Sequence, residues 1–197
     1  DFMDPYYKVK QTVVKDVLYD VNFAAMPAVD RCTSCHLGIA NPDFKDAEQP
    51  YTTHPDLDLY LTSKSPHPEE SFGCTSCHSG RSRGTSFISS AHTPNSPEQK
   101  KEWKEKYNWK PVKHWLQPML PTRYTQASCF KCHQNTSDLA GAEKINLGLT
   151  LVDRSGCNGC HVSGNWESKG KSGPDLRKLN EKSHPDWVAK WIKNPRA

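Results

Sequence analysis

Long hydrophobic runs are missing from this sequence, and hydrophobic residues of any kind are few. They make up 35% of the 197 residues, whereas globular proteins usually have about 45–50% when glycine is counted. No stretch of about 18 apolar residues occurs, so the sequence predicts no membrane-spanning helix. We therefore expect a thin aliphatic core, with other packing material or extensive loops making up the difference.

The sequence also lacks a strong excess of charge of one sign. The formal net charge is +4, and the one local cluster of lysines, in residues 100–110, alternates with Glu102 and Glu105. This alternation is typical of a solvated helix face rather than of a nucleic-acid-binding stripe. We therefore predict no nucleic-acid partner.

A recognisable secretion signal is likewise missing. The chain starts at Asp1 and stops at Ala197, inside what reads as the end of a helix. This favours a processed or cut piece of a longer protein. Any membrane association is then expected to come through segments outside this chain.

No cysteine stands outside one repeated pattern, in which two cysteines are separated by two residues and followed directly by histidine. The eight cysteines form four copies of it. The copies are Cys32-Thr-Ser-Cys35-His36, Cys74-Thr-Ser-Cys77-His78, Cys129-Phe-Lys-Cys132-His133 and Cys157-Asn-Gly-Cys160-His161.

Several chemistries use cysteine pairs, and the histidines discriminate among them. Four pairs could build two four-cysteine zinc sites, but zinc does not require histidine after each second cysteine. With 9 histidines in 197 residues, four such histidines by chance have odds of roughly one in 10⁵. A disulfide framework does not predict them either, and a thioredoxin-like dithiol needs one pair in a βαβ unit. The pattern indicates covalent attachment of c-type haem.

The spacing suits that chemistry. Two thiols two residues apart can form thioether bonds to the two vinyl groups of one haem, and the next residue can then direct its imidazole at the iron. The predicted cofactors are four c-type haems, attached through the eight cysteines. The predicted proximal iron ligands are His36, His78, His133 and His161.

On these four motifs the chain resembles the multihaem c-type cytochromes. The resemblance implies haem attachment outside the cytoplasm, and hence a periplasmic or other extracytoplasmic location. It also implies a chain held together by its cofactors, with short helices. The predicted fold class is mainly α with extensive loops, a haem-packed core and little or no β structure.

Apolar spacing predicts where the helices lie. In residues 1–30, five apolar side chains follow a helical period, and we expect a packing helix there. They are Val13, Val14, Val17, Leu18 and Val21. Prolines make residues 37–73 loop-like. Ser96 and Pro97 predict the start of a helix that runs to about Trp109.

The last 60 residues or so differ from the rest in the order of their expected helices and motif. An expected helix leads into the fourth motif, Gly173-Pro174-Asp175-Leu176 follows, and a second helix starts at Pro185. This order resembles a class I cytochrome c domain, so we predict two domains, residues 1–137 with three haems and residues 138–197. The resemblance implies that the Pro174 carbonyl supports His161. It also implies a distal Met after the last helix, which we expect beyond Ala197.

The remaining histidines are candidates for the distal iron ligands. His54 and His92 stand at matching places behind the first and second motifs, His67 precedes the second motif, and His114 precedes the third. The alternative for each is a surface histidine in a polar loop. Two weaker candidates are Met119, which competes with His114, and His184, for which a helix cap is the simpler explanation.

The predicted function is electron transfer through four closely spaced haems, in a respiratory or extracellular electron-transfer chain. Expected partners are a donor and an acceptor redox protein, and the chain is expected to be a subunit of a larger membrane-associated assembly. The alternative is a multihaem oxidoreductase with one five-coordinate catalytic iron. No residue cluster clearly builds such a pocket, so a carrier is favoured over an enzyme and no catalytic residue is predicted.

Overall fold

The computed structural model describes residues 9–21, 23–115, 117–134, 136, 138–163 and 172–195. The chain forms two compact units, residues 1–129 and 130–197, and each is described separately. The division falls inside the third cysteine motif. The expected boundary after residue 137 stays a prediction.

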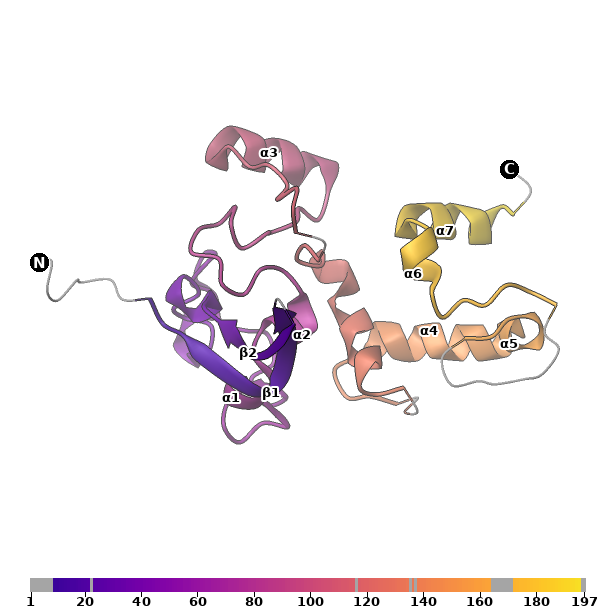
Figure 1. Cartoon of the computed structure of the whole chain (residues 1–197), viewed down its shortest axis with the longest axis horizontal. Coiled ribbons are helices and arrows are strands. Elements are labelled where there is room, and N and C mark those ends of the chain that lie inside the picture. The colour runs from indigo at the N-terminus through magenta and orange to yellow at the C-terminus, as the bar shows by residue number, and fades with distance from the viewer. Residues whose placement is uncertain are drawn as a thin grey trace, which may run out of the picture. The chain divides into compact units, whose positions relative to one another are not determined.

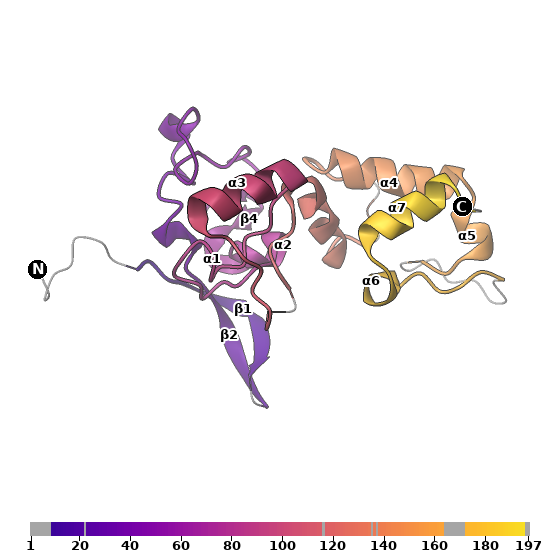
Figure 2. The same cartoon turned by 90° about the horizontal axis from the view of Figure 1, so that it is seen from above.

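The first unit begins with an antiparallel hairpin of β1 (Thr12–Val21) and β2 (Ala24–Asp30). Val14 pairs with Ala28 in the register, and these two side chains are 1% and 3% exposed. The neighbouring Val13 is exposed, as the alternation of a half-buried strand requires. Figure 2 shows the hairpin reaching away from the helices of its unit.

The helix expected in residues 1–30 is therefore wrong. A register irregularity between Val14 and Leu18 interrupts the alternation of β1, and this produces the three- and four-residue apolar spacing that resembles a helical face. Valine side chains pack well on a pleated surface. Pairing with β2 therefore decides the structure over the local spacing.

Short elements make up the rest of the first unit (Figure 1). Two 3₁₀ turns, η1 (Cys32–Ser34) and η2 (Pro42–Phe44), follow the hairpin. A short parallel pair joins β3 (Tyr60–Leu61) to β4 (His67–Pro68). The helices α1 (Glu69–Phe72) and α2 (Thr75–His78) come next, and α1 contacts β1.

The longest helix of the first unit is α3 (Pro97–Tyr107), and it confirms the predicted start. The Ser96 hydroxyl accepts from the Gln99 amide at 3.2 Å, and Pro97 occupies the first turn. Asn108, in the left-handed region at φ 51°, ends the helix. The 3₁₀ helix η3 (Thr122–Lys131) leads into the third motif.

The second unit contains α4 (Glu143–Arg154), α5 (Cys157–Cys160), α6 (Leu179–Lys182) and α7 (Pro185–Lys193). The helices predicted before the fourth motif and from Pro185 are thus present. The His184 ring nitrogen accepts from the Asp186 amide at 3.3 Å at the start of α7. His184 therefore caps this helix, which was the simpler of the two explanations for this residue.

The predicted fold class is wrong. The described residues contain two small sheets, β1–β2 and β3–β4, where little or no β structure was expected. Evidence for a core packed by helices is weak, because only a few apolar side chains of the described residues are buried. These are Val14, Ala28, Ala91, Trp109 and Ala142. Apolar spacing alone could not distinguish a bulged hairpin from a helix, and short helices bury little.

Candidate haem-binding site

Three of the four cysteine motifs share one local geometry. In each, the histidine amide donates to the carbonyl of the first cysteine, at 3.0 Å for His36, 3.0 Å for His78 and 2.9 Å for His161. This bond closes a single helical turn that starts at the first cysteine. Residues three apart lie on the same side of such a turn, so both cysteines face one direction. The first three residues of the third motif form the end of η3, and its His133 is half-buried.

His36 of the first motif faces a second imidazole. The centroids of the His36 and His92 rings lie 6.2 Å apart, with 33° between the ring planes. His92 comes from the loop after the second motif and lies just ahead of α3. A hollow of about 450 Å³ opens beside His36, and Leu37 and Ile39 are among its lining residues.

His78 of the second motif has a partner of the same kind. Its ring centroid lies 6.2 Å from that of His54, with 81° between the planes. Each of the first two motifs therefore lies beside a histidine that follows the other motif in the sequence. His92 follows the second motif but faces the first, whereas His54 follows the first motif but faces the second.

This spacing fits a metal ion held between two imidazoles. Ring nitrogens bind metals at about 2.0 Å, which puts the centroids of two coaxial rings about 6 Å apart. Ring pairs without a metal also have centroid distances of about 4.5–7 Å, as in the 6.4 Å contact between Trp103 and Trp109, so the distance permits a shared metal without requiring one. The residues present therefore fit a haem iron with two histidine ligands at each of these two places.

Among the paired rings, a backbone carbonyl holds His92 by its Nδ1 atom, and another carbonyl holds His67, which lies outside the pairs. The Nδ1 atom of His92 lies 2.7 Å from the Phe87 carbonyl oxygen, and that of His67 lies 3.1 Å from the Leu59 carbonyl oxygen. A metal-binding histidine typically donates its other ring N–H in this way. In His92 the Nε2 atom then carries the lone pair that a metal would bind.

The paired imidazoles are also held in the neutral form that a ligand needs. Burial is the main reason that the pKa of each lies below its usual value, and the charge of a neighbouring imidazole adds to it for His36 and His78. The same burial effect lowers the pKa of His54 and of His92. Neutral imidazole is the form that binds metals.

His67 belongs to neither pair but is well placed. Its ring lies between those of Tyr60 and Phe72, with centroid distances of 5.4 and 5.1 Å. The prediction that His67 binds an iron stays a prediction.

His114 and Met119 lie in different surroundings. His114 is exposed and lines a hollow of about 560 Å³ together with Arg81, Lys110 and Lys113. Met119 is half-buried, and its amide donates to the Ala91 carbonyl at 2.9 Å. A ligand role for either one stays a prediction.

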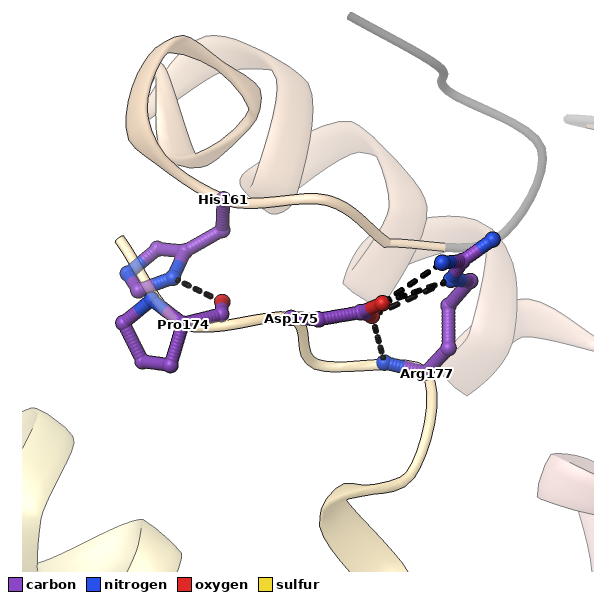
Figure 3. A network of polar contacts seen from close by, with 4 residues as sticks. All are labelled: His161, Pro174, Asp175 and Arg177. Carbon is purple, nitrogen blue, oxygen red and sulfur yellow. Dashed lines mark hydrogen bonds and ion pairs between the residues drawn. The ribbon is translucent and has the colours of Figure 1, made fainter. Parts of the chain in front are cut away.

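The fourth motif has the backbone contact that the class I resemblance implied. The His161 Nδ1 atom lies 2.8 Å from the Pro174 carbonyl oxygen (Figure 3). The Gly173 amide donates to the Cys160 carbonyl at 2.7 Å, and a Cβ on Gly173 would come within 2.6 Å of the His161 Nδ1 atom. Only glycine leaves room for this approach.

An exposed ion pair braces the same loop. Arg177 donates through its side chain and its amide to the Asp175 carboxylate, with a shortest distance of 2.6 Å (Figure 3). These bonds lower the pKa of Asp175 to about 2. The pair lies directly beside the Pro174 carbonyl in the sequence, and as an exposed pair it stabilises the loop only modestly.

The first cysteines of the first two motifs meet at Asp30. Ligand atoms of Asp30, Cys32 and Cys74 all lie within 4.8 Å of one another, and such a group could bind a metal. In the metal-free protein the Cys74 thiol and then burial raise the pKa of the Cys32 thiol above its usual range. Cys35 and Cys77 stand outside the group, so it is not the four-cysteine site considered above.

The disulfide alternative finds no support. All eight cysteines lie in the described ranges, and all are free thiols there. Their positions are instead repeated from motif to motif, with each first cysteine half-buried. Such exposure leaves the sulfur atoms available for covalent attachment.

Two important residues were missed from the sequence. Asp30 precedes the first motif by two positions, and Gly173 was noted only as part of a resemblance. A buried acid can be suspected beside a cysteine motif, but its partners Cys74 and Thr75 lie more than forty positions away. Only the fold brings them together.

Comparisons with known proteins identify no relative. The chain matches no family model, no curated protein and no solved structure. A search of the described residues also found no helix long and apolar enough to cross a membrane.

Proposed function

We propose that this chain is an electron-transfer protein with four covalently attached c-type haems. The eight motif cysteines would hold the haems by thioether bonds. His36, His78, His133 and His161 would bind the irons from the proximal side. His92 would supply the second ligand of the first haem, and His54 that of the second.

One observation carries this proposal, namely the two imidazole pairs. Each joins the histidine of a cysteine motif to a histidine outside any motif, and both have the same centroid distance of 6.2 Å. All four imidazoles are half-buried, and this spacing would accommodate one iron between the two rings of each pair. An iron closed by two histidines has no open position for a substrate, which favours a carrier over a catalyst.

The haem supplies the one-electron redox chemistry when it is bound. The chain's own residues hold and orient it. The Phe87 carbonyl fixes the His92 ring, and the Pro174 carbonyl fixes the His161 ring. Fixed ligands reduce the rearrangement that accompanies a change of oxidation state, and burial of the imidazoles limits the access of water.

Partners and location follow from this role. An electron carrier needs a donor and an acceptor, so we propose two redox partner proteins and a place in a larger membrane-associated assembly. The resemblance to multihaem cytochromes implies an extracytoplasmic location. Its class I part suggests that the fourth haem has a higher potential than the others, since a methionine ligand raises the potential.

The decisive experiment counts haems and open irons in the purified holoprotein. The pyridine haemochrome assay and the intact mass should give four covalently bound haems per chain. Carbon monoxide is then added to the dithionite-reduced protein, and the Soret band is followed. Two irons at least should resist carbon monoxide, because the two pairs close them. A chain without haem, or with four open irons, would contradict the proposal.

A catalytic role at one iron is the second candidate. It is favoured by His161, for which the described residues of its own unit contain no facing imidazole, since His184 caps α7. An iron there that binds carbon monoxide in the full-length native protein would support this candidate. Closure of all four irons would eliminate it.

A further inference from the structure

Asp30 is a buried carboxylate between the first two cysteine motifs. It is the last residue of β2, and its side chain is 2% exposed. Its Oδ2 atom accepts from the Cys74 amide at 2.7 Å, the Thr75 amide at 3.0 Å and the Thr75 hydroxyl at 3.2 Å. Its Oδ1 atom accepts from the Cys32 thiol at 2.9 Å.

All of these partners are donors, so the carboxylate acts only as an acceptor, which is the role of its ionised form. Within the described residues the structure gives it no ion pair with lysine or arginine. The negative charge is therefore balanced by hydrogen bonds alone. Bonds to backbone amides at the start of α2 are among the stronger kinds, because the acceptor is charged.

The contacts of Asp30 join two haem attachment segments that are distant in sequence. Cys32 belongs to the first motif, and Cys74 and Thr75 belong to the second. Gly73 packs against the same carboxylate, since a Cβ on Gly73 would come within 2.8 Å of the Oδ2 atom. When Cys32 forms a thioether its thiol no longer donates, but the three bonds to Cys74 and Thr75 remain.

We propose that Asp30 is a positioning residue that links the first and second haem attachment segments and lowers the reduction potential of both haems. The inference rests on the proposed function. A ferric haem carries one more positive charge than a ferrous one, so a nearby negative charge favours the ferric state. The effect is large where the surroundings are buried and poorly screened.

The test replaces the carboxylate by its neutral isostere, Asp30→Asn, in the holoprotein. Spectroelectrochemical titration should show that two of the four midpoint potentials become more positive while the other two are unchanged. Haem content, measured by the pyridine haemochrome assay, should remain four per chain. Unchanged potentials in all four haems would overturn the inference.

Two further variants separate charge from packing. Asp58→Asn removes the same charge from an exposed position of the same unit, and it should leave every potential unchanged because water and salt screen that site. Thr75→Val keeps the Asp30 charge but removes one donor to it. Its potentials should stay or become more negative, and a rise like that of Asp30→Asn would show that packing rather than charge is responsible.

The wild-type haem count separates this inference from the proposed function. A native chain without haem defeats both. A native chain with four haems, combined with an Asp30→Asn variant whose potentials do not move, defeats the role of Asp30 alone. If Asp30→Asn loses haem, the Thr75→Val titration decides the sign of the effect.

Discussion

The rings of His36 and His92 face one another with their centroids 6.2 Å apart, although the second cysteine motif lies between them in the sequence. The rings of His54 and His78 lie at the same distance. Here the histidine outside the motifs, His54, follows the first motif in the sequence and faces the second. Each pair therefore joins segments on both sides of a motif, and if the proposed haems are present, neither of these two sites would form by itself. This arrangement explains how a unit with so few buried apolar side chains can bring its two motifs together.

Removal of a paired histidine should open one iron. In His92→Ala and in His54→Ala, the reduced holoprotein should bind about one more carbon monoxide per chain than the wild type, because an iron with one axial ligand has a free position. The Soret band measures this directly. The matched control is His184→Ala, whose ring caps α7 and whose loss should add no carbon monoxide. Variants that bind no more than the wild type would contradict the pairing.

The two pairs should differ in their electron paramagnetic resonance spectra. Their ring planes meet at 33° and 81°, and the orientation of the axial ligand planes sets the splitting of the ferric d orbitals. The near-perpendicular pair should give a signal with a large maximal g value, and the other pair a rhombic signal. His54→Ala should abolish the first and His92→Ala the second. Loss of the same signal in both variants would argue against this assignment.

Gly173→Ala should disturb the fourth site. The new methyl group would lie 2.6 Å from the His161 Nδ1 atom and 2.8 Å from the Cys160 carbonyl oxygen, so the loop must shift. We expect a loss of about 1–3 kcal/mol in the free energy of unfolding, measured by denaturant titration. Gly148→Ala in α4 has nothing within 4 Å and should instead gain about 0.5–1 kcal/mol. Equal effects in both variants would remove the special role of Gly173.

Asp175 should contribute a stability that depends on pH. The folded protein lowers the pKa of this carboxyl to about 2, below its unfolded value of about 3.9. The contribution is therefore complete above about pH 4 and disappears as the pH falls through 2. The melting temperatures of wild type and Asp175→Asn should differ at pH 6 and converge near pH 2. Asp153→Asn, an exposed acid on α4, serves as the control, and an equal difference there would assign the effect to net charge.

Much of the candidate site can be predicted from the sequence because its chemistry is local. The distance from the first cysteine to the histidine fits within one helical turn, and three motifs do form that turn. The start of α3 at Pro97 and the capping role of His184 are local for the same reason, since each depends on hydrogen bonds within a few residues. The helix expected around Val13 and Val17 failed because its true partner, β2, is a separate segment.

The sequence by itself determined the four motifs, the histidine that ends each of them and the helices that begin at Pro97 and Pro185, because the interactions that define them span no more than a few residues. The tertiary structure alone decided which second histidine faces which motif, and it placed the Asp30 carboxylate against Cys74 and Thr75. Those relationships depend on how distant segments pack. Spacing along the chain does not encode them, because a loop can close over many lengths at a similar cost in entropy.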